Sequence, residues 1–231
     1  MAYTNSSLVD IKMISPNSNN PRNHSIDTIT IHHTACCVTA KRIGEIFAPV
    51  ARQASCNYGV GCDGKVVMCV EEKNRSWCSS SPSNDHRAIT IEVSNDEAGC
   101  KNGSWTVSEL TMKKLIQLVA DICKRNGIKK LIWANTARDR INRVGGCNLT
   151  LHKDLAATGC PGPYLEKQIP NRIVPEVNKI LTGNTPAPQP KSNTLYRVQI
   201  GAFSVKANAE AYRQKAIKAG FKDAFIVEVK R

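Results

Sequence analysis

The sequence predicts an α/β protein in which helices flank a central mixed β-sheet, followed by a small C-terminal β-α-β module. Three observations support this prediction. Short segments with alternating β-branched residues indicate strands, and longer segments with an apolar period of 3.6 residues indicate helices between them. A proline-rich stretch near the C-terminus divides the chain. Strands and helices that alternate along a chain are typical of a sheet covered by helices.

Strand predictions come first. Residues 27–32 (DTITIH) and 88–93 (AITIEV) alternate in polarity and are rich in β-branched side chains. Residues 58–70 carry Asp63 and Gly64 between two apolar runs, which predicts a hairpin with its turn at this pair. Residues 130–134 (KLIWA) are predicted to form a further short strand.

Helix predictions rest on periodicity and on capping residues. Residues 39–51 are predicted to be helical with Thr39 as the N-cap. Residues 106–125 are predicted to be helical with Ser108 as the cap and Gly127 as the stop. A last helix is predicted at residues 175–181. The apolar side of the second helix is expected to carry Leu110, Leu115, Leu118, Val119 and Ile122.

The domain boundary is expected in the sequence NTPAPQPKSN, which begins at Asn184. Its three alternate prolines exclude a helix or an inner strand and favour an extended spacer. We therefore predict a first domain at residues 1–183, a linker at 184–194 and a small module at 195–231.

Composition limits the partners of the protein. Its net charge of +13 predicts attraction to an anionic polymer, which is either nucleic acid or a bacterial cell wall. No nucleic-acid reader motif is recognisable and aromatic residues make up only 5%, so we expect no nucleic acid partner. No apolar stretch is long enough for a membrane span, and the first residues do not resemble a secretory signal. Synthesis in the cytoplasm is expected, with the ten cysteines mostly reduced and buried.

Two histidines and a cysteine are the candidate metal ligands. His32 ends a predicted strand next to a loop, while His152 and Cys160 stand eight residues apart around a segment that ends in Cys-Pro-Gly. Taken alone, His32 fits a half-buried hydrogen-bonded histidine better than a metal ligand, and His152 and Cys160 fit a surface histidine and one more buried cysteine. Together the three residues offer three ligands and leave the fourth tetrahedral position open, which is the arrangement of a catalytic zinc.

Glu92 is the candidate acid–base residue. It shares one face of the strand at 88–93 with Thr90, while Ile89, Ile91 and Val93 share the other face. A carboxylate inside such a strand is costly unless it is solvated, paired or functional. The alternative is a charge on a solvent-facing edge of the sheet.

Four motifs resemble, in order, those of the zinc amidase family, which includes N-acetylmuramoyl-L-alanine amidases and phage endolysins. They are ITIHHTA, SCNYGVGCDGKVV, RAITIEVSND and LHKDLAATGCPG, and the resemblance extends over about residues 26–181. It implies one zinc ion per chain, held by His32, His152 and Cys160, with Glu92 moving protons. It also implies substrate contacts by Asn57 and by Thr158, which replaces a lysine that some members have.

The activity implied by this resemblance is hydrolysis of the amide bond between N-acetylmuramic acid and L-alanine in peptidoglycan. The implied setting is lysis of a Gram-positive wall after release from the cell, as for a phage or prophage endolysin. The alternative is a non-catalytic peptidoglycan-binding protein of the same fold. Such members typically lack the cysteine ligand, and the presence of Cys160 therefore favours an enzyme.

The segment YRVQIGAF, followed by ANAEAY, resembles the first half of a SPOR domain, a family that binds glycan strands. Strands are expected at residues 195–203 and 225–229, with a helix at 208–220. Half of such a sheet has an unpaired edge. We expect a wall-binding tail that pairs with a second copy as a homodimer; a loosely structured basic tail is the alternative.

Overall fold

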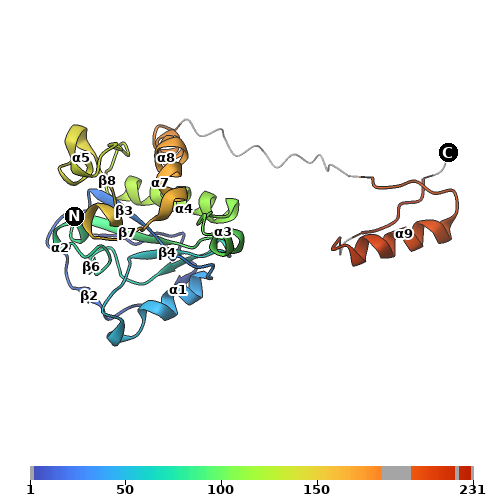
Figure 1. Cartoon of the computed structure of the whole chain (residues 1–231), viewed down its shortest axis with the longest axis horizontal. Helices are drawn as coiled ribbons and strands as arrows, with labels where there is room; N and C mark the ends of the chain where they lie inside the picture. The colour runs from blue at the N-terminus through green and yellow to red at the C-terminus, as the bar shows by residue number, and fades with distance from the viewer. Residues whose placement is uncertain (1–2, 184–198, 222–223, 230–231) are drawn as a thin grey trace. The chain divides into compact units, whose positions relative to one another are not determined.

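The computed structural model describes residues 3–183, 199–221 and 224–229. The chain folds as two compact units, of which the first is Met1–Thr185 and the second is Pro186–Arg231. Figure 1 draws both, and each is described by itself below.

A six-stranded mixed sheet forms the centre of the first unit, in the order β1-β5-β4-β7-β3-β8. Strand β4 is antiparallel to β5, whereas β4, β7, β3 and β8 are mutually parallel where they pair. The predicted strands at 27–32 and 88–93 are confirmed as β3 and β7. The bounds are β1 Ile11–Lys12, β3 Thr28–His33, β4 Tyr58–Val60, β5 Val66–Met68, β7 Ala88–Val93 and β8 Leu149–Leu151.

The predicted hairpin is confirmed as β4 and β5, which pair from Tyr58 with Met68 to Val60 with Val66. Gly64 has a φ of +69°, which a residue without a Cβ adopts at low cost. Asp63 accepts a hydrogen bond from the Ala40 backbone N–H, 3.1 Å away, and so ties the turn to the start of the first helix.

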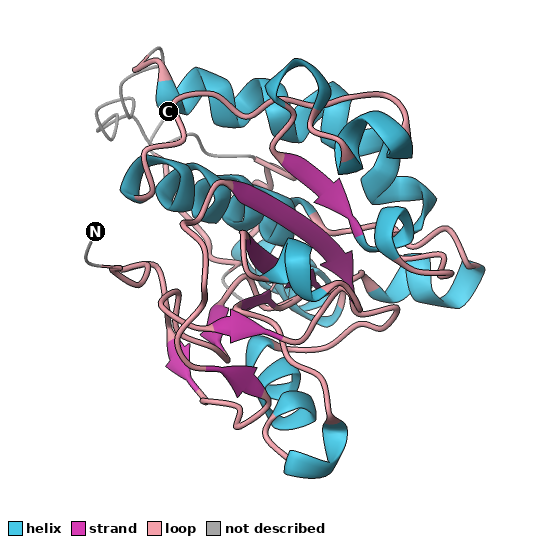
Figure 2. Ribbon diagram, turned by 90° about the vertical axis from the view of Figure 1, so that its left-hand side faces the viewer, coloured by secondary structure: helices cyan, strands magenta, loops and turns pink. Residues whose placement is uncertain are grey.

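Helices cover both faces of the sheet (Figures 1 and 2). Helix α1, Ala40–Phe47, begins at Thr39, whose side chain accepts from the Arg42 N–H as predicted. It ends four residues earlier than predicted, just before Pro49. Helix α4, Glu109–Arg125, lies on the opposite face and is capped by Ser108, also as predicted.

One residue of α4 contradicts its predicted apolar side. Leu115, Leu118 and Ile122 are fully buried, but Leu110 is 57% exposed. Leu110 stands in the first turn of the helix, where a Cβ placed on Gly64 would meet its side chain at 2.6 Å. It therefore covers the hairpin turn at the rim of the molecule instead of entering the core.

The prediction of a strand at residues 130–134 is wrong, because this segment pairs with no other strand of the sheet. Two asparagine side chains take the place of a strand partner. The Leu131 N–H donates to Asn178 Oδ1 at 2.7 Å, and the Ile132 N–H donates to Asn148 Oδ1 at 2.7 Å. The extended backbone is thus satisfied without a neighbouring strand.

The two faces of β3 differ in polarity. Ile29 and Ile31 enter the main core with α4, whereas Thr28, Thr30 and His32 point to the other face. There, Thr30 Oγ1 lies 2.8 Å from Thr150 Oγ1 and accepts from the Asn84 side-chain amide at 3.0 Å. Buried threonines on this face are therefore satisfied by each other and by helix α2, Pro82–Asp85.

The remaining elements of the first unit frame this polar face or extend the core. A two-stranded ribbon joins β2 to β6, and helix α8 confirms the helix predicted at 175–181. Their bounds are β2 Ser18–Asn19, η1 Val50–Arg52, β6 Arg75–Ser76, α3 Glu97–Asn102, α5 Ala137–Ile141, η2 Val144–Gly146, α6 His152–Leu155, α7 Gly162–Gln168, the π-helix η3 Ile169–Ile173 and α8 Val174–Leu181.

The second unit contains helix α9, Lys206–Lys218. Neither of the two strands predicted beside it forms among the residues that the structure describes. Residues 195–198 of the first predicted strand lie outside the described residues. Several apolar side chains of this unit are exposed: Ile200, Phe203, Val205, Tyr212, Phe221, Phe225, Val227 and Val229.

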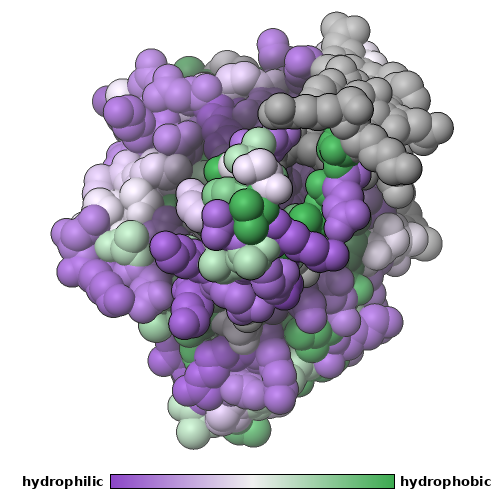
Figure 3. Space-filling view, turned by 90° about the vertical axis from the view of Figure 1, so that its right-hand side faces the viewer, coloured by the Kyte–Doolittle hydropathy of each residue, from purple (hydrophilic) through white to green (hydrophobic). Residues whose placement is uncertain are grey.

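The side chains that can be seen in Figure 3 are mostly hydrophilic, and the apolar ones among them form only small patches. Within the described part of the chain, no helix combines the length and apolar character that crossing a membrane requires.

Candidate metal centre and its cleft

His32 and Glu92 form the base of the site because their strands are paired in parallel. His32 of β3 stands opposite Glu92 of β7 in the register, so both side chains point to the polar face. On the other side of β7, Glu92 pairs with Gly59. A Cβ on Gly59 would meet Ile43 at 2.6 Å, so this glycine lets α1 pack closely beside Glu92.

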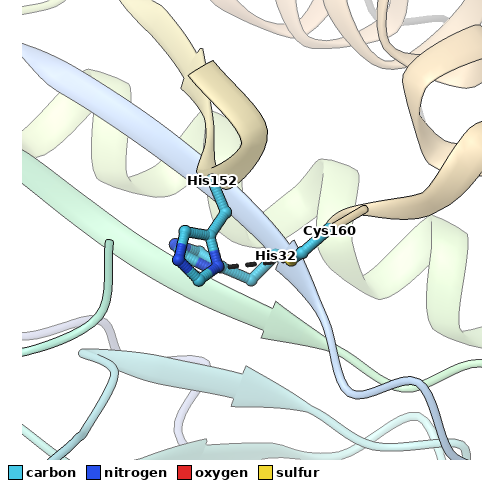
Figure 4. Close-up of side chains that lie close together, drawn as sticks. All are labelled: His32, His152 and Cys160. Atoms are coloured by element: carbon cyan, nitrogen blue, oxygen red, sulfur yellow. Dashed lines mark hydrogen bonds between the residues drawn. The ribbon is translucent and has the colours of Figure 1, made fainter. Parts of the chain in front are cut away.

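His152 and Cys160 complete a group of three ligand atoms. His152 begins α6 directly after β8, the other neighbour of β3. One ligand atom from each of His32, His152 and Cys160 lies within 4.8 Å of the other two. Cys160 Sγ is 3.7 Å from His32 Nδ1, and the two imidazole centroids are 4.7 Å apart. Figure 4 shows the three side chains gathered at one point.

Backbone contacts hold Cys160 beside the sheet. The His33 N–H donates to Cys160 Sγ at 3.3 Å, and the Lys153 N–H donates to the Cys160 carbonyl at 2.9 Å. The peptide bond between Cys160 and Pro161 is cis. The cysteine is therefore fixed both to the end of β3 and to the helix that carries His152.

A buried ion pair supports the turn that carries His152. Asp154 accepts from the Leu151 N–H at 2.8 Å and pairs with the Arg140 guanidinium at 2.7 and 2.6 Å. Arg140 in turn lies over the Trp133 ring, 4.3 Å from its centroid. The angle at which α6 leaves β8 is thus set by groups that are themselves buried.

The protonation states of the histidines suit a cation. Burial lowers the pKa of His32 well below its ordinary value and also lowers the pKa of His152, so both imidazoles are neutral at pH 7. His32 Nε2 is buried and has no hydrogen-bond partner among the described residues.

The thiol of Cys160 behaves differently. Burial and the nearby Glu92 raise its pKa to about 12. A divalent cation reverses this preference, because a coordinating thiol is deprotonated outright. Two neutral imidazoles and one thiol at this spacing are the donor set of a zinc site with one open position. The residues therefore fit zinc.

Glu92 borders this group. Its Oε2 atom is buried without a hydrogen-bond partner among the described residues. Burial raises its pKa to about 8, although the positive charge of Arg52 acts in the opposite direction. A carboxyl group with a pKa near neutrality can both accept and return a proton.

A cleft of about 370 Å³ opens beside Glu92 and His152. Arg52 lines it from η1, and Arg75 and Trp77 line it from the β6 region. Arg75 Nε is buried without a partner in the described part of the chain. The cleft wall therefore carries two arginines beside the buried carboxyl groups of Glu92 and Asp85, and the arginines suit a substrate with anionic substituents.

Of the two residues assigned to substrate, only Thr158 is accessible. It is exposed, and its Oγ1 accepts from the Cys160 N–H at 3.2 Å. Asn57 is fully buried. Its amide donates to the Val70 carbonyl at 3.2 Å, and its Oδ1 accepts from the Thr90 N–H at 3.2 Å. The polar atoms of Asn57 thus hold strands together, and the substrate contact expected of it stays a prediction.

Cys78 is a neighbour of the site that the sequence did not reveal. One ligand atom from each of His32, Cys78 and Glu92 lies within 4.8 Å of the other two. Burial and the charge of Glu92 raise the pKa of Cys78 well above its ordinary value. Its position depends on the loop before α2, and no spacing in the sequence relates it to His32.

Comparisons with known proteins agree with this architecture. The model of the N-acetylmuramoyl-L-alanine amidase family matches residues 22–163, and the model of the SPOR domain matches residues 192–231. No curated protein sequence matches the chain.

Several solved structures share the fold. A selenomethionine derivative of AmpD is 14% identical to this chain with a TM-score of 0.54, and the match covers 75% of this chain and 99% of the AmpD chain. PlyL is 13% identical with a TM-score of 0.51, covering 76% and 98%. The catalytic domain of XlyA is 14% identical with a TM-score of 0.50, covering 72% and 97%. At these identities the likeness establishes the fold alone.

Proposed function

The chain belongs to the N-acetylmuramoyl-L-alanine amidase family, and from that membership we propose that it hydrolyses the amide bond between N-acetylmuramic acid and L-alanine in peptidoglycan. One zinc ion per chain is held by His32, His152 and Cys160. The observation that carries the proposal is the grouping of these three ligand atoms within 4.8 Å, beside the buried carboxyl group of Glu92.

His32, His152 and Cys160 would hold the zinc ion, which would supply a Lewis acid for the scissile carbonyl. Glu92 supplies the proton transfers. Its carboxylate accepts a proton from the attacking water and then returns one to the nitrogen of the leaving L-alanine. The raised pKa of Glu92, about 8, supports this role because the proton is held and released near neutral pH.

The wall of the cleft orients the substrate. Arg52 and Arg75 attract anionic groups of the substrate toward Glu92. The exposed Thr158 beside Cys160 offers a hydroxyl at the rim. A hydroxyl is a weaker stabiliser of negative charge than an ammonium group, so Thr158 contributes orientation more than charge.

The second unit serves as the wall-binding tail. The match to the SPOR domain and the basic charge of the chain support binding to glycan strands of the wall. Its exposed apolar side chains support pairing with a second copy as a homodimer. The enzyme then acts on the wall after release from the cell, as in wall lysis by an endolysin.

Digestion of purified peptidoglycan tests the activity. The zinc-loaded enzyme is incubated with the wall, and the new ends are identified by mass spectrometry. New free amines on L-alanine are expected, with no new reducing sugar. Reducing sugar ends would identify a glycosidase, and wall binding without new ends would identify a non-catalytic binder.

A further inference from the structure

Three cysteines that lie outside the metal group belong to segments that follow the carboxyl ends of the parallel strands. Cys37 belongs to the 34–38 loop, which follows β3. Cys62 belongs to the turn after β4, and Cys100 belongs to α3, which follows β7. Three loops that are far apart in the sequence thus bring thiols to the edge of the sheet that also carries His32 and Glu92.

Backbone hydrogen bonds fix the 34–38 loop across the end of β7. The Asn95 N–H donates to the Cys36 carbonyl at 3.2 Å, and the Cys62 N–H donates to the Val38 carbonyl at 2.9 Å. Ser94 Oγ donates to the Cys36 carbonyl at 3.2 Å as well. The loop therefore reaches from β3 to the hairpin turn, and residue 37 is held next to residue 62.

The side chains are neighbours at this point. The thiols of Cys62 and Cys100 lie near enough to that of Cys37 to raise its pKa, and the Cys62 N–H donates to the carbonyl of Val38, the residue after Cys37. All three residues are partly exposed, so a small reagent can reach them. Burial and the neighbouring thiols raise the pKa of Cys37 to about 11, so exchange at its sulfur accelerates in mildly alkaline solution.

A second pair of cysteines offers an internal comparison. Cys56 and Cys69 also interact through their thiols, but both are fully buried in the apolar cluster under α1. Oxidation depends on exposure as well as on proximity. The buried pair is therefore protected in the folded protein, whereas Cys37 and Cys62 are accessible.

We propose that Cys37 and Cys62 form a disulfide that closes the 34–38 loop onto the hairpin turn when the protein meets a low-molecular-weight disulfide. The thiolate of one cysteine attacks the reagent, releasing one small thiol and leaving a mixed disulfide. The thiolate of the other cysteine then displaces the second small thiol. Two protons leave the cysteines, and the reagent is reduced to two thiols.

The bond would act on the part of the fold that carries the site. The 34–38 loop begins directly after His33, and its path fixes the end of β3 beside β7. A bridge between residues 37 and 62 restricts the unfolded chain over the intervening segment, which includes α1 and β4. Oxidation is therefore expected to stabilise the catalytic unit without contact to the three metal ligands.

The test treats the full-length zinc-loaded protein with oxidised glutathione at mildly alkaline pH, followed by alkylation, proteolysis and mass spectrometry without reduction. A cross-linked peptide pair joining Cys37 to Cys62 is expected, with Cys56 and Cys69 alkylated only after denaturation. The melting temperature is expected to rise by ~5–10 °C on oxidation and to return to its original value when the disulfide is reduced.

Single serine variants decide which sulfurs react. Cys37→Ser and Cys62→Ser are expected to abolish both the cross-link and the rise in melting temperature, whereas Cys36→Ser, in the same loop, is expected to keep both. Cross-linking that survives in Cys37→Ser overturns the proposal. The proposal is also overturned if the unmodified protein binds a second equivalent of zinc that Cys62→Ser does not bind, because the thiols would then hold a metal.

Discussion

His32 and Glu92 are directly paired across the parallel strands β3 and β7, and both side chains lie on the polar face of the sheet. The pairing fixes the proposed metal ligand and the proposed proton carrier in one rigid unit. Because strand register changes only in whole residues, a slip of one position would send one of them to the apolar face.

Glu92→Gln is expected to retain zinc and to lower the rate of wall hydrolysis by ~10²-fold or more, because the amide cannot carry the proton. Zinc by elemental analysis and release of L-alanine amines are the measurements. Glu45→Gln is the matched control and should keep full activity, because Glu45 is partly exposed on α1 and pairs with Lys41 and Arg42 of the same helix. Near-normal hydrolysis by Glu92→Gln would refute its role.

Cys160→Ser is expected to lower the zinc content of the purified protein, because a hydroxyl is a poorer zinc ligand than a thiolate. Elemental analysis measures the ratio of zinc to protein. Cys147→Ser is the control, since Cys147 Sγ contacts the Leu149 carbonyl outside the metal group. An unchanged zinc ratio in Cys160→Ser would remove Cys160 from the set of ligands.

Chelation of the metal is expected to abolish hydrolysis while leaving the fold intact. The core between the sheet and α4 contains none of the three ligands and keeps its apolar contacts without the ion. The melting temperature should fall, because the ion binds only the folded site. Circular dichroism and activity after dialysis with a chelator, then after added zinc, measure both effects. Unfolding on chelation would show instead that the ion is structural.

Arg140→Met is expected to destabilise the first unit by about 3–5 kcal/mol, because Asp154 would remain as a buried, unpaired charge. Both side chains of this pair are at most 4% exposed. Urea unfolding measures the change. Arg172→Met, which breaks exposed pairs with Glu109 and Glu176, is the control and should change the midpoint little. Equal effects of the two variants would contradict the importance of burial.

Deletion of residues 184–231 is expected to weaken binding to insoluble peptidoglycan but to leave turnover of a soluble muramoyl-peptide unchanged. The first unit contains the whole proposed site, so the deletion removes only the tail. A wall pull-down and a soluble assay separate the two effects. Sedimentation of the full chain measures pairing of the tail. Unchanged wall binding would contradict the anchoring role, and a monomeric mass at high concentration would contradict the homodimer.

Much of the fold could be predicted from local patterns. The strands β3 and β7 follow from alternating β-branched residues, and the caps Thr39 and Ser108 mark where α1 and α4 begin. The segment 130–134 has the same local pattern as a strand, yet Asn148 and Asn178 satisfy its backbone. These two asparagines are distant from the segment in the sequence, so the local pattern of residues 130–134 could not show that its backbone has no strand partner.

The sequence by itself determined which residue types meet and in what order, namely the histidines and the cysteine of the metal group and the glutamate on its strand. Only the tertiary structure decided which polar groups are free. It buries Asn57 between strands, leaves Leu110 exposed, places Cys78 beside Glu92 and brings the loop of Cys37 next to Cys62. Residue identity fixes the chemistry that a group can perform. Its partners and its access to solvent depend on packing between distant segments, which a one-dimensional pattern does not specify.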